Sequence, residues 1–234
     1  MSKYQKVVEQ IEQNIIDNHL QQGDKLPTFQ DLMKQYDVSK STIVKALNIL
    51  EKRGVIYQIQ GSGVFVRRRK RTGYINFLES QGFTADLKEF QMKSKVLAVE
   101  LIRPNEEVRA NLKCAAEEQV YFVKRLRFIN DQILCIEESY YRQKYVPYLS
   151  RSIAEESLFH YVEKALGLTI SFSDKYLHVR KLDEKESELL ELEAGDPALF
   201  VEELFYLSTG EPFDFSRMVY HYEHSQFFVQ SNGL

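Results

Sequence analysis

The chain has 234 residues, 44% of them hydrophobic and 28% charged, which is typical of a globular protein with one large domain or two modest ones. No apolar run reaches the roughly 18 residues of a membrane span, and the first residues lack a signal-peptide core, so we expect a cytoplasmic protein. Two cysteines, Cys114 and Cys135, are too few for a disulfide framework or a zinc knuckle.

Charge is distributed unevenly along the chain. Residues 1–71 hold 13 Lys or Arg against 7 Asp or Glu, whereas residues 72–234 hold 18 against 27. A basic first part on an acidic remainder is typical of a nucleic-acid-binding head joined to a separate body.

Three helices are predicted in the first part. Apolar residues at three- and four-residue steps predict a helix from Tyr4 to about His19. Thr28, followed three residues later by an acid, is a helix N-cap and begins a second helix that ends near residues 36–37. Ser39 begins a third helix, and Gly54 suits its left-handed C-terminal position.

A hairpin follows these helices. Residues 55–59 and 64–66 are β-type runs on either side of the glycine-rich turn 60–63, and five cations follow at 67–71. Two helices joined by a tight turn are typical of a helix-turn-helix motif, and the small, basic face of the second helix suits a recognition helix. The hairpin that follows is typical of a wing. The positions predicted to contact DNA are Thr28, Gln30, Ser39, Lys40, Ser41, Thr42, Val44, Lys45, Gly61, Ser62 and Gly63.

The segment from Tyr4 to Val66 resembles the DNA-binding domain of GntR-type transcription regulators. The resemblance is carried by residues 23–28, 38–42, 46–47, 50–51, 54–56 and 60–66. The chain departs from the family at residues 28–30, which read Thr-Phe-Gln rather than Ser-Glu-Arg, and at Lys40 and Val44, where arginine is usual. Valine can meet only a thymine methyl or pack, so we expect a non-consensus operator.

The rest of the chain reads as strands interrupted by helices. Strands are expected at 96–103, 120–129, 133–142, 168–182, 198–207 and 212–222, with helices after Asn105, at 157–166 and at 183–192. This order predicts an α+β domain with a mostly antiparallel sheet.

This region resembles the UTRA ligand-sensing domain of the HutC subgroup, whose fold is chorismate-lyase-like. The most similar stretches are residues 124–128, 136–139, 157–159, 190–197 and 206–212. The resemblance implies a small-molecule effector and a homodimer. The expected organisation is a winged helix-turn-helix domain at 1–66, a basic linker at 67–76 and a UTRA-like domain at 77–234.

Two arginines point to a binding site independently of the resemblance. Arg125 and Arg127 are two apart on a strand, so both point to one face, where guanidinium forks suit a carboxylate or phosphate. Either Glu137 or Glu138 lies across the hairpin from Arg125, depending on the loop length. The alternative is a cross-strand salt bridge on a solvated face.

The family's effector positions fall on Arg125, Arg127, Glu137, Ser157, Phe159, Asp214 and Tyr220. Where sugar-phosphate-sensing relatives have a Ser/Thr-rich stretch, residues 74–80 include Glu79, which would repel a phosphate. The predicted effector is therefore another anionic or polyhydroxylated metabolite.

Other chemistry is disfavoured. His221 and His224 lie three apart on an expected strand and would point to opposite faces, so no metal site is predicted. No cofactor motif, nucleophile–base pair or P-loop occurs. The sequence thus predicts an effector-controlled transcription regulator that binds a palindromic double-stranded operator as a homodimer, and the resemblance implies that it is a repressor. The alternatives are an enzyme of chorismate-lyase-like fold fused to a DNA-binding head, and a constitutive architectural DNA-binder.

Overall fold

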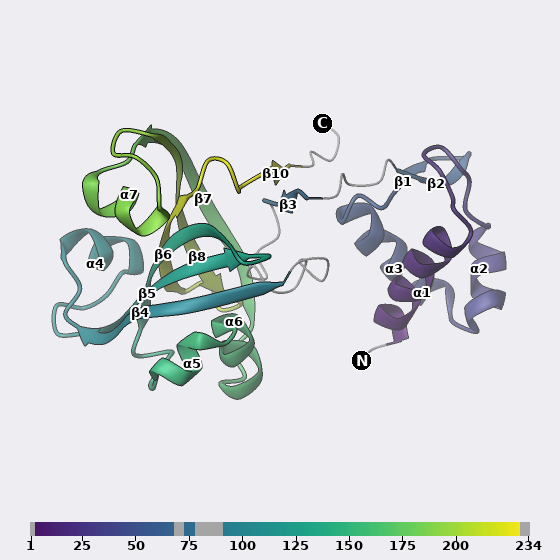
Figure 1. The fold of residues 1–234 in the computed structure, drawn as a ribbon. Helices are drawn as coiled ribbons and strands as arrows, with labels where there is room; N and C mark the ends of the chain where they lie inside the picture. Colours follow the sequence, from purple (N-terminus) through teal and green to yellow (C-terminus); the bar gives the residue numbers. More distant parts are fainter. Residues whose placement is uncertain (1–2, 68–72, 78–90, 230–234) are drawn as a thin grey trace. The chain divides into compact units, whose positions relative to one another are not determined.

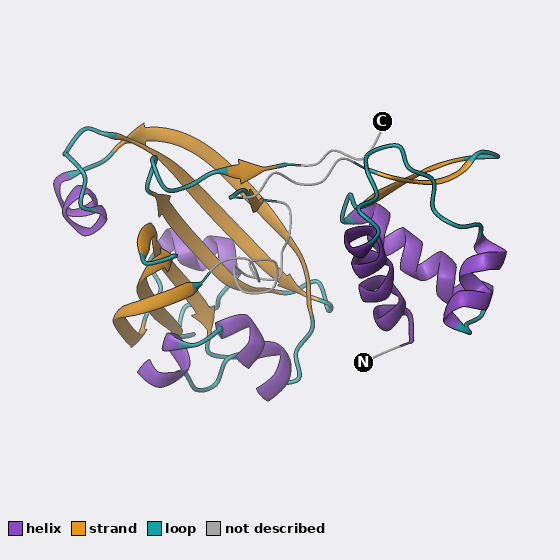
Figure 2. Cartoon of the chain, turned by 45° about the vertical axis from the view of Figure 1, so that its right-hand side comes forward, coloured by secondary structure: helices purple, strands orange, loops and turns teal. Residues whose placement is uncertain are grey.

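The computed structural model describes residues 3–67, 73–77 and 91–229. The chain forms two compact units, one made of Met1–Tyr74 with Phe228–Leu234 and the other of Ile75–Phe227. Figure 1 shows their elements in sequence colours, and Figure 2 shows the helices and strands. No helix in the described residues is long and apolar enough to cross a membrane.

The first unit contains three helices and a two-stranded hairpin: α1 (Lys3–Asp17), α2 (Phe29–Tyr36), α3 (Lys40–Lys52), β1 (Ile56–Ile59) and β2 (Gly63–Val66). Thr28 caps α2 as predicted, because its side chain accepts from the Asp31 N–H while the Asp31 carboxylate accepts from the Thr28 N–H. Gly54 follows α3 with φ of 67°, the left-handed conformation that ends the helix. The helices bury one shared apolar core.

The second unit is built on a six-stranded sheet in the order β4-β5-β6-β9-β8-β7, with every neighbouring pair antiparallel. The α+β fold with a mostly antiparallel sheet is confirmed. The strands are β4 (Met92–Ile102), β5 (Val120–Ile129), β6 (Gln132–Arg142), β7 (Ile170–Lys181), β8 (Pro197–Leu207) and β9 (Pro212–Tyr220). The short strands β3 (Ile75–Asn76) and β10 (Phe227–Phe228) pair with each other.

Helices lie on both faces of this sheet. They are α4 (Glu106–Leu112), α5 (Arg151–Glu155), α6 (Leu158–His160), which continues into the π-helical turn η1 (Tyr161–Ala165), and α7 (Glu184–Leu190). On one face, α5 and α6 pack with side chains such as Tyr121 and Val123. On the other, α7 packs with Leu126 and Phe200, and α4 packs with Phe215. Alternation along each strand therefore assigns every side chain to one helix layer or the other.

Several boundaries differ from the sequence prediction. Helix α5 was not expected, and the helix expected at 157–166 is α6 with a π-helical turn. Strand β9 ends at Tyr220 rather than continuing to residue 222. The β5–β6 loop has two residues, Asn130 and Asp131, both with positive φ, as in a tight hairpin turn.

That two-residue loop alone would place Ile136 opposite Arg125. A register shift follows Phe128, which pairs with Ile133, so that Arg127 pairs with Cys135 and Arg125 pairs with Glu137. The extra residue in β6 is a β-bulge, which re-aims the side chains beyond it. The question left open by the sequence is settled by the bulge, and Glu137 faces Arg125.

Candidate functional site

The exposed side of α3 forms an open hollow in the surface of the first unit. The opposite side of the helix is buried through Ile43, Ala46, Leu47 and Leu50. Of the seven residues that line the hollow, three are lysines and none is acidic: Lys40, Ser41, Val44, Lys45, Asn48, Ile49 and Lys52. A cationic helix side of this kind can enter a major groove and contact phosphates.

Some predicted DNA-contact residues are held by their own chain. The Thr28 hydroxyl is occupied in the α2 cap, where it donates to Asp31 at 2.6 Å. Among the described residues, the Ser39 hydroxyl bonds the hydroxyls of Ser41 and Thr42, each at 3.0 Å, rather than a backbone N–H. The Lys45 ammonium lies 4.0 Å from the centroid of the Tyr4 ring. Ser39 thus stands at the N-cap position of α3 as predicted, but its side chain makes no capping hydrogen bond.

The wing is hydrogen-bonded both to the C-terminal end of α3 and to the residues that precede α2. Glu51, near the end of α3, accepts from the backbone N–H of Gln58 at 3.0 Å and from its side-chain amide at 2.8 Å. Residues 23–26 bond along β2, since Leu26 N–H donates to Val64 and Val66 N–H donates to Asp24. At the tip, Gly61 has φ of 78° and Gly63 has φ of 128°. The hairpin therefore sits in a set position relative to α3.

The second unit contains a buried charge cluster on the face that carries α5 and α6. Glu137 on β6 accepts from Arg125 at 2.5 Å through one oxygen and from Arg127 at 2.8 Å through the other. All three residues are at most 7% exposed. The two arginines share a face as predicted, and of the two glutamates left open by the sequence it is Glu137 that lies opposite Arg125. The ion pair is buried rather than on a solvated face.

Arg125 also connects the sheet to the helices above it. Its Nη1 donates to the carbonyls of Ala154 and Glu156, at 3.0 and 3.3 Å, where α5 ends and just before Ser157. Among the described residues, its buried Nε has no hydrogen-bond partner. Arg125 is therefore largely occupied by its own chain, and its Nε N–H is left for an acceptor.

Hydroxyl groups connect Glu137 to Asp214 on β9. Ser139 donates to Glu137 at 3.2 Å, Ser216 lies 2.8 Å from Ser139, and Ser216 lies 2.8 Å from Asp214. A hydroxyl has one proton, so Ser216 cannot donate to both neighbours. A protonated Asp214 completes a one-way chain in which each group donates once, ending on Glu137.

The pKa values of the two carboxyls shift in opposite directions. Burial alone would raise the pKa of Glu137, but Arg125 and Arg127 outweigh it and lower the pKa to about 2. Burial raises the pKa of Asp214 well above its usual value, with the negative charge of Glu137 adding to the shift and the Ser216 hydrogen bond opposing it. The cluster thus favours the ionised form of Glu137 and the protonated form of Asp214.

The remaining predicted effector residues lie at the edges of this cluster. Tyr220 is buried on the same face, and its hydroxyl donates to the Met218 sulfur at 3.3 Å. Ser157 caps α6 by accepting from the His160 N–H. Phe159 packs edge-on to Phe205 with ring centroids 4.7 Å apart.

The sequence reasoning missed four polar residues of this face. Ser139 and Ser216 lie two positions from Glu137 and Asp214, so strand alternation could have found them. Glu203 on β8 and Lys175 on β7 continue the row as a 3.1 Å ion pair, and burial raises the pKa of Glu203 while Lys175 opposes that shift. The polar cluster therefore extends across the sheet from β5 to β7.

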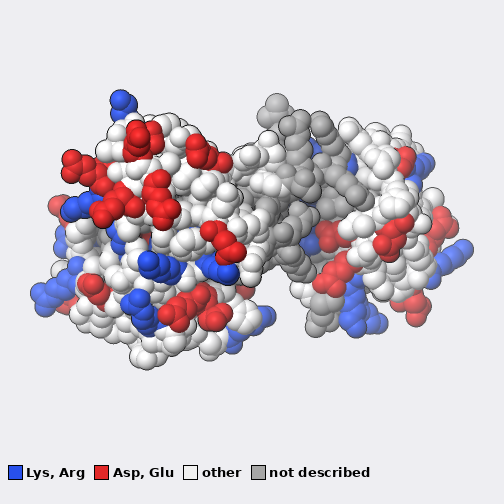
Figure 3. Space-filling view, in the orientation of Figure 1, with Lys and Arg blue, Asp and Glu red and all other residues white. Residues whose placement is uncertain are grey.

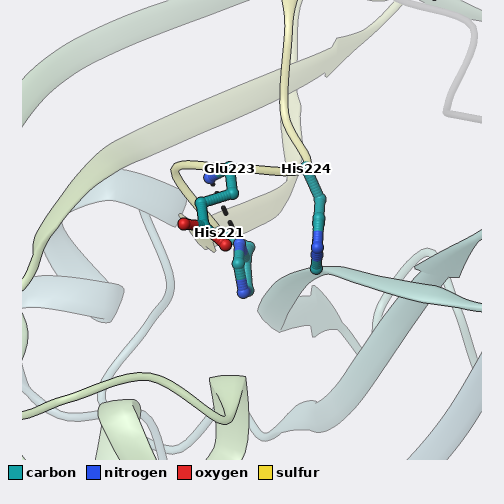
Figure 4. Close-up of side chains that lie close together, drawn as sticks. All are labelled: His221, Glu223 and His224. Atoms are coloured by element: carbon teal, nitrogen blue, oxygen red, sulfur yellow. Dashed lines mark hydrogen bonds between the residues drawn. The ribbon is translucent and has the colours of Figure 1, made fainter.

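The expectation that His221 and His224 point apart is wrong. They lie in a turn after β9, where the Ser225 N–H donates to the His221 carbonyl, and their rings stack with centroids 3.8 Å apart and planes at 13° (Figure 4). Donor atoms of these two and Glu223 lie within 4.8 Å of one another. Metal-binding lone pairs lie in the ring plane, so stacked rings direct them in parallel rather than toward one ion. This geometry gives no support for a metal centre.

Glu137 and Glu138 offer a matched pair of tests. Glu137→Gln is expected to lower the free energy of unfolding by about 3–5 kcal/mol, because it leaves two buried arginines without their carboxylate. Glu138→Gln removes a partly exposed partner of Lys124 and is expected to cost less than about 1 kcal/mol. Urea unfolding at pH 7 measures both, and equal costs would contradict the buried-pair assignment. The cost of Glu137→Gln should shrink as pH falls from about 4.5 toward 2, where the wild-type carboxylate takes up its proton.

Asp214→Asn tests the protonated chain. The raised pKa of Asp214 means that its contribution to stability is present at low pH and is lost as pH rises above the unfolded-state value near 3.8. Asparagine keeps a donor toward Ser216 without a proton to lose. The stability of Asp214→Asn relative to wild type should therefore rise with pH, by up to about 1.4 kcal/mol per pH unit. Urea unfolding from pH 4 to 8 measures it, with exposed Asp174→Asn as the control for the substitution; a constant difference would show that Asp214 is ionised.

Comparison with known proteins agrees with both units. Residues 3–66 match the bacterial regulatory proteins of the gntR family, and residues 88–226 match the UTRA domain. The HTH-type transcriptional regulator YydK of Bacillus subtilis is 51% identical over 234 residues, which cover 100% of this chain and 99% of the relative. Its crystal structure has a TM-score of 0.90 at 50% identity, covering 99% of this chain and 100% of that one.

More distant relatives carry names that state a role. The mannosyl-D-glycerate transport/metabolism system repressor MngR of Escherichia coli is 26% identical over 96% of this chain and 93% of its own. The effector-binding domain of the B. subtilis trehalose repressor TreR has a TM-score of 0.55 at 25% identity, covering 60% of this chain and 98% of that one. These relatives are regulators rather than enzymes, so the enzyme alternative is set aside. The chain belongs to the GntR family of bacterial transcription regulators, with a UTRA effector domain behind its DNA-binding head.

Proposed function

We propose that this regulator is a cytoplasmic, homodimeric repressor that binds a palindromic operator and is controlled by a polyhydroxylated effector. The proposed domains are a DNA-binding domain at 1–66, a linker at 67–76 and an effector domain at 77–234. The observation that carries the proposal is that one chain contains both a lysine-lined surface on α3 and, in its second unit, a buried polar cluster.

DNA contact is assigned to α3 and the wing. Lys40, Lys45 and Lys52 supply cations for phosphates, while Ser41 and Asn48 can reach base edges. Val44 is 38% exposed on this side, where it suits a thymine methyl. The second unit offers less to DNA, because acidic side chains gather around its α7 end (Figure 3).

A homodimer follows from the length of operator that one head can read. One recognition helix covers a single half-site, and helix-turn-helix dimers bind two half-sites about one helical turn apart. A two-fold symmetric protein therefore reads a palindrome. The cation run at 68–71 and Glu79 lie outside the described residues, so the linker is assigned here on sequence alone.

The chemistry of the cluster favours hydroxyl groups over a phosphate. Both oxygens of Glu137 are already bonded to Arg125 and Arg127, so the arginines face a carboxylate of their own chain. The neighbouring groups are hydroxyls and carboxyls, namely Ser139, Ser216, Asp214 and Glu203. Such groups exchange hydrogen bonds with polyols. The descriptions of MngR and TreR name mannosyl-D-glycerate and trehalose, both of which are polyhydroxylated, in agreement with this class.

Control of DNA binding is assigned to the contact between Arg125 and the end of α5. An effector that bonds Glu137 or the free Arg125 N–H changes how firmly the Ala154 and Glu156 carbonyls are held. The α5–α6 segment then takes a different position or mobility. A difference in effector affinity between the two states of about 1–3 kcal/mol suffices for regulation.

Lys40→Ala and Lys45→Ala test the DNA surface. Operator sequences are first selected from random duplex DNA with the full chain. Each substitution is expected to weaken binding and to reduce the salt slope by about one, because each removes one phosphate contact. Lys185→Ala, an exposed lysine on α7, is the control and should bind as wild type does. No loss at either α3 lysine would contradict the assignment.

The effector class is tested by thermal unfolding of the full chain with neutral sugars and polyols, sugar acids and sugar phosphates in parallel. A neutral or carboxylated polyol should raise the unfolding temperature and release selected DNA, since a ligand of the folded state stabilises it by mass action. Ser216→Ala should weaken the binding of that ligand. The DNA affinity of the ligand-free protein should stay unchanged. A shift given by sugar phosphates alone would contradict the proposed class.

A further inference from the structure

The surface that α3 offers to DNA has one cation near its middle. Of the three lysines that line the hollow, Lys40 is the first residue of α3, Lys52 is its last, and Lys45 lies between them. Val44 stands directly before Lys45 and has no hydrogen-bond donor on its side chain. The positive charge for a phosphate at the centre of this surface therefore comes from Lys45.

The Lys45 ammonium lies over an aromatic ring from a different helix. Its Nζ is 4.0 Å from the centroid of the Tyr4 ring, which belongs to the first turn of α1. Among the described residues, Lys40 and Lys52 have no comparable ring contact and no ion pair. Within that part of the chain, Lys45 is thus the lysine of the hollow whose ammonium is held in place.

Two contacts fix the register of α1 against α3. The helices lie side by side (Figure 1) and share the apolar core of the first unit. Eight positions after Tyr4 on α1, Glu12 pairs at 3.3 Å with Arg53, which stands eight positions after Lys45. Equal spacing on both sides means that the helices run in the same direction, in register over about 12 Å. The Tyr4 ring therefore has a set place beside Lys45.

An aromatic ring attracts a cation without using up its hydrogen bonds. The ring face carries the negative part of the quadrupole, and an ammonium has three N–H donors, so one side of the ammonium can meet the ring while another meets a phosphate. The lysine stem is flexible, and ordering it on binding costs conformational entropy. A ring that already restricts the Lys45 side chain lowers that cost.

We propose that Tyr4 is a positioning residue for DNA binding, which holds the Lys45 ammonium toward an operator phosphate and stays beside it in the complex. This inference rests on the assignment of α3 to DNA in the proposed function, and it gives the first turn of α1 a part in that function. The opposite arrangement, in which the ring withdraws Lys45 from DNA, predicts tighter binding when the ring is removed.

A double-mutant cycle measures the coupling between the two side chains. Tyr4→Leu, Lys45→Ala and the double variant are compared in the full chain on the selected operator. Tyr4→Leu should weaken binding about two- to fivefold, the range of an exposed cation–π contact, because leucine keeps the helix and its apolar contacts but removes the ring face. In the Lys45→Ala background, Tyr4→Leu should have no further effect.

Two matched variants separate positioning from helix packing. Tyr4→Phe keeps the ring and should restore most of the affinity that Tyr4→Leu loses. Glu12→Gln breaks the contact with Arg53 at the far end of the same helix pair and should not weaken binding. The circular dichroism spectrum and unfolding temperature of each variant check that it is folded.

Nuclear magnetic resonance reports on the ring contact itself. The methylene protons next to the Lys45 ammonium should be shifted upfield by the Tyr4 ring in the wild type, and Lys45→Ala identifies their signal. The shift should be present both in the free protein and in the operator complex, and it should be lost in Tyr4→Leu.

The outcomes separate this inference from the proposed function. Unchanged or tighter operator binding by Tyr4→Leu would overturn the inference, as would an equal loss in the Lys45→Ala background, which would assign Tyr4 to helix packing. A ring shift that disappears when operator binds would also overturn it. Each of these results leaves α3 as the DNA surface. No loss for Lys45→Ala itself would instead remove Lys45 from that surface, and the inference with it.

Discussion

The buried contact of Glu137 with Arg125 and Arg127 is the constraint on which the second unit depends. Two guanidinium groups removed from water need a counter-charge, and one carboxylate serves both of them. Arg125 also donates to the end of α5, so the same charge cluster joins strands β5 and β6 to the helix layer above them. Under the proposed function, a ligand that competes for Glu137 would therefore also act on α5 and α6.

The two faces of the sheet differ in polarity. One residue along from Glu137, Glu138 faces the other side and bonds Lys124 in a partly exposed pair. The α4 and α7 side is mainly apolar where the helices pack, while the α5 and α6 side carries the polar row from β5 to β7. Alternation along the strands thus keeps a destabilising polar cluster on one face and conventional packing on the other.

Much of this arrangement was predictable from local pattern. The Thr28 cap, the wing and the succession of strands along the second unit follow from caps, turns and period-two alternation, whereas the order of the strands in the sheet was not predicted. The partner of Arg125 was not predictable, because it depends on a bulge in β6 that no turn residue signals. The prediction that His221 and His224 point apart was wrong for a related reason. Strand β9 ends at Tyr220, directly before His221, and the turn that follows stacks the two rings.

The proposed place of effector action is the face between β5, β6 and the α5–α6 segment. Hydrogen–deuterium exchange of the full chain, with and without a polyol that shifts its unfolding temperature, tests this most directly. The account predicts that exchange changes in residues 151–160 and in β5 and β6, since these segments share Arg125 and Glu137. Changes confined to other parts of the second unit, with residues 151–160 unaffected, would contradict it.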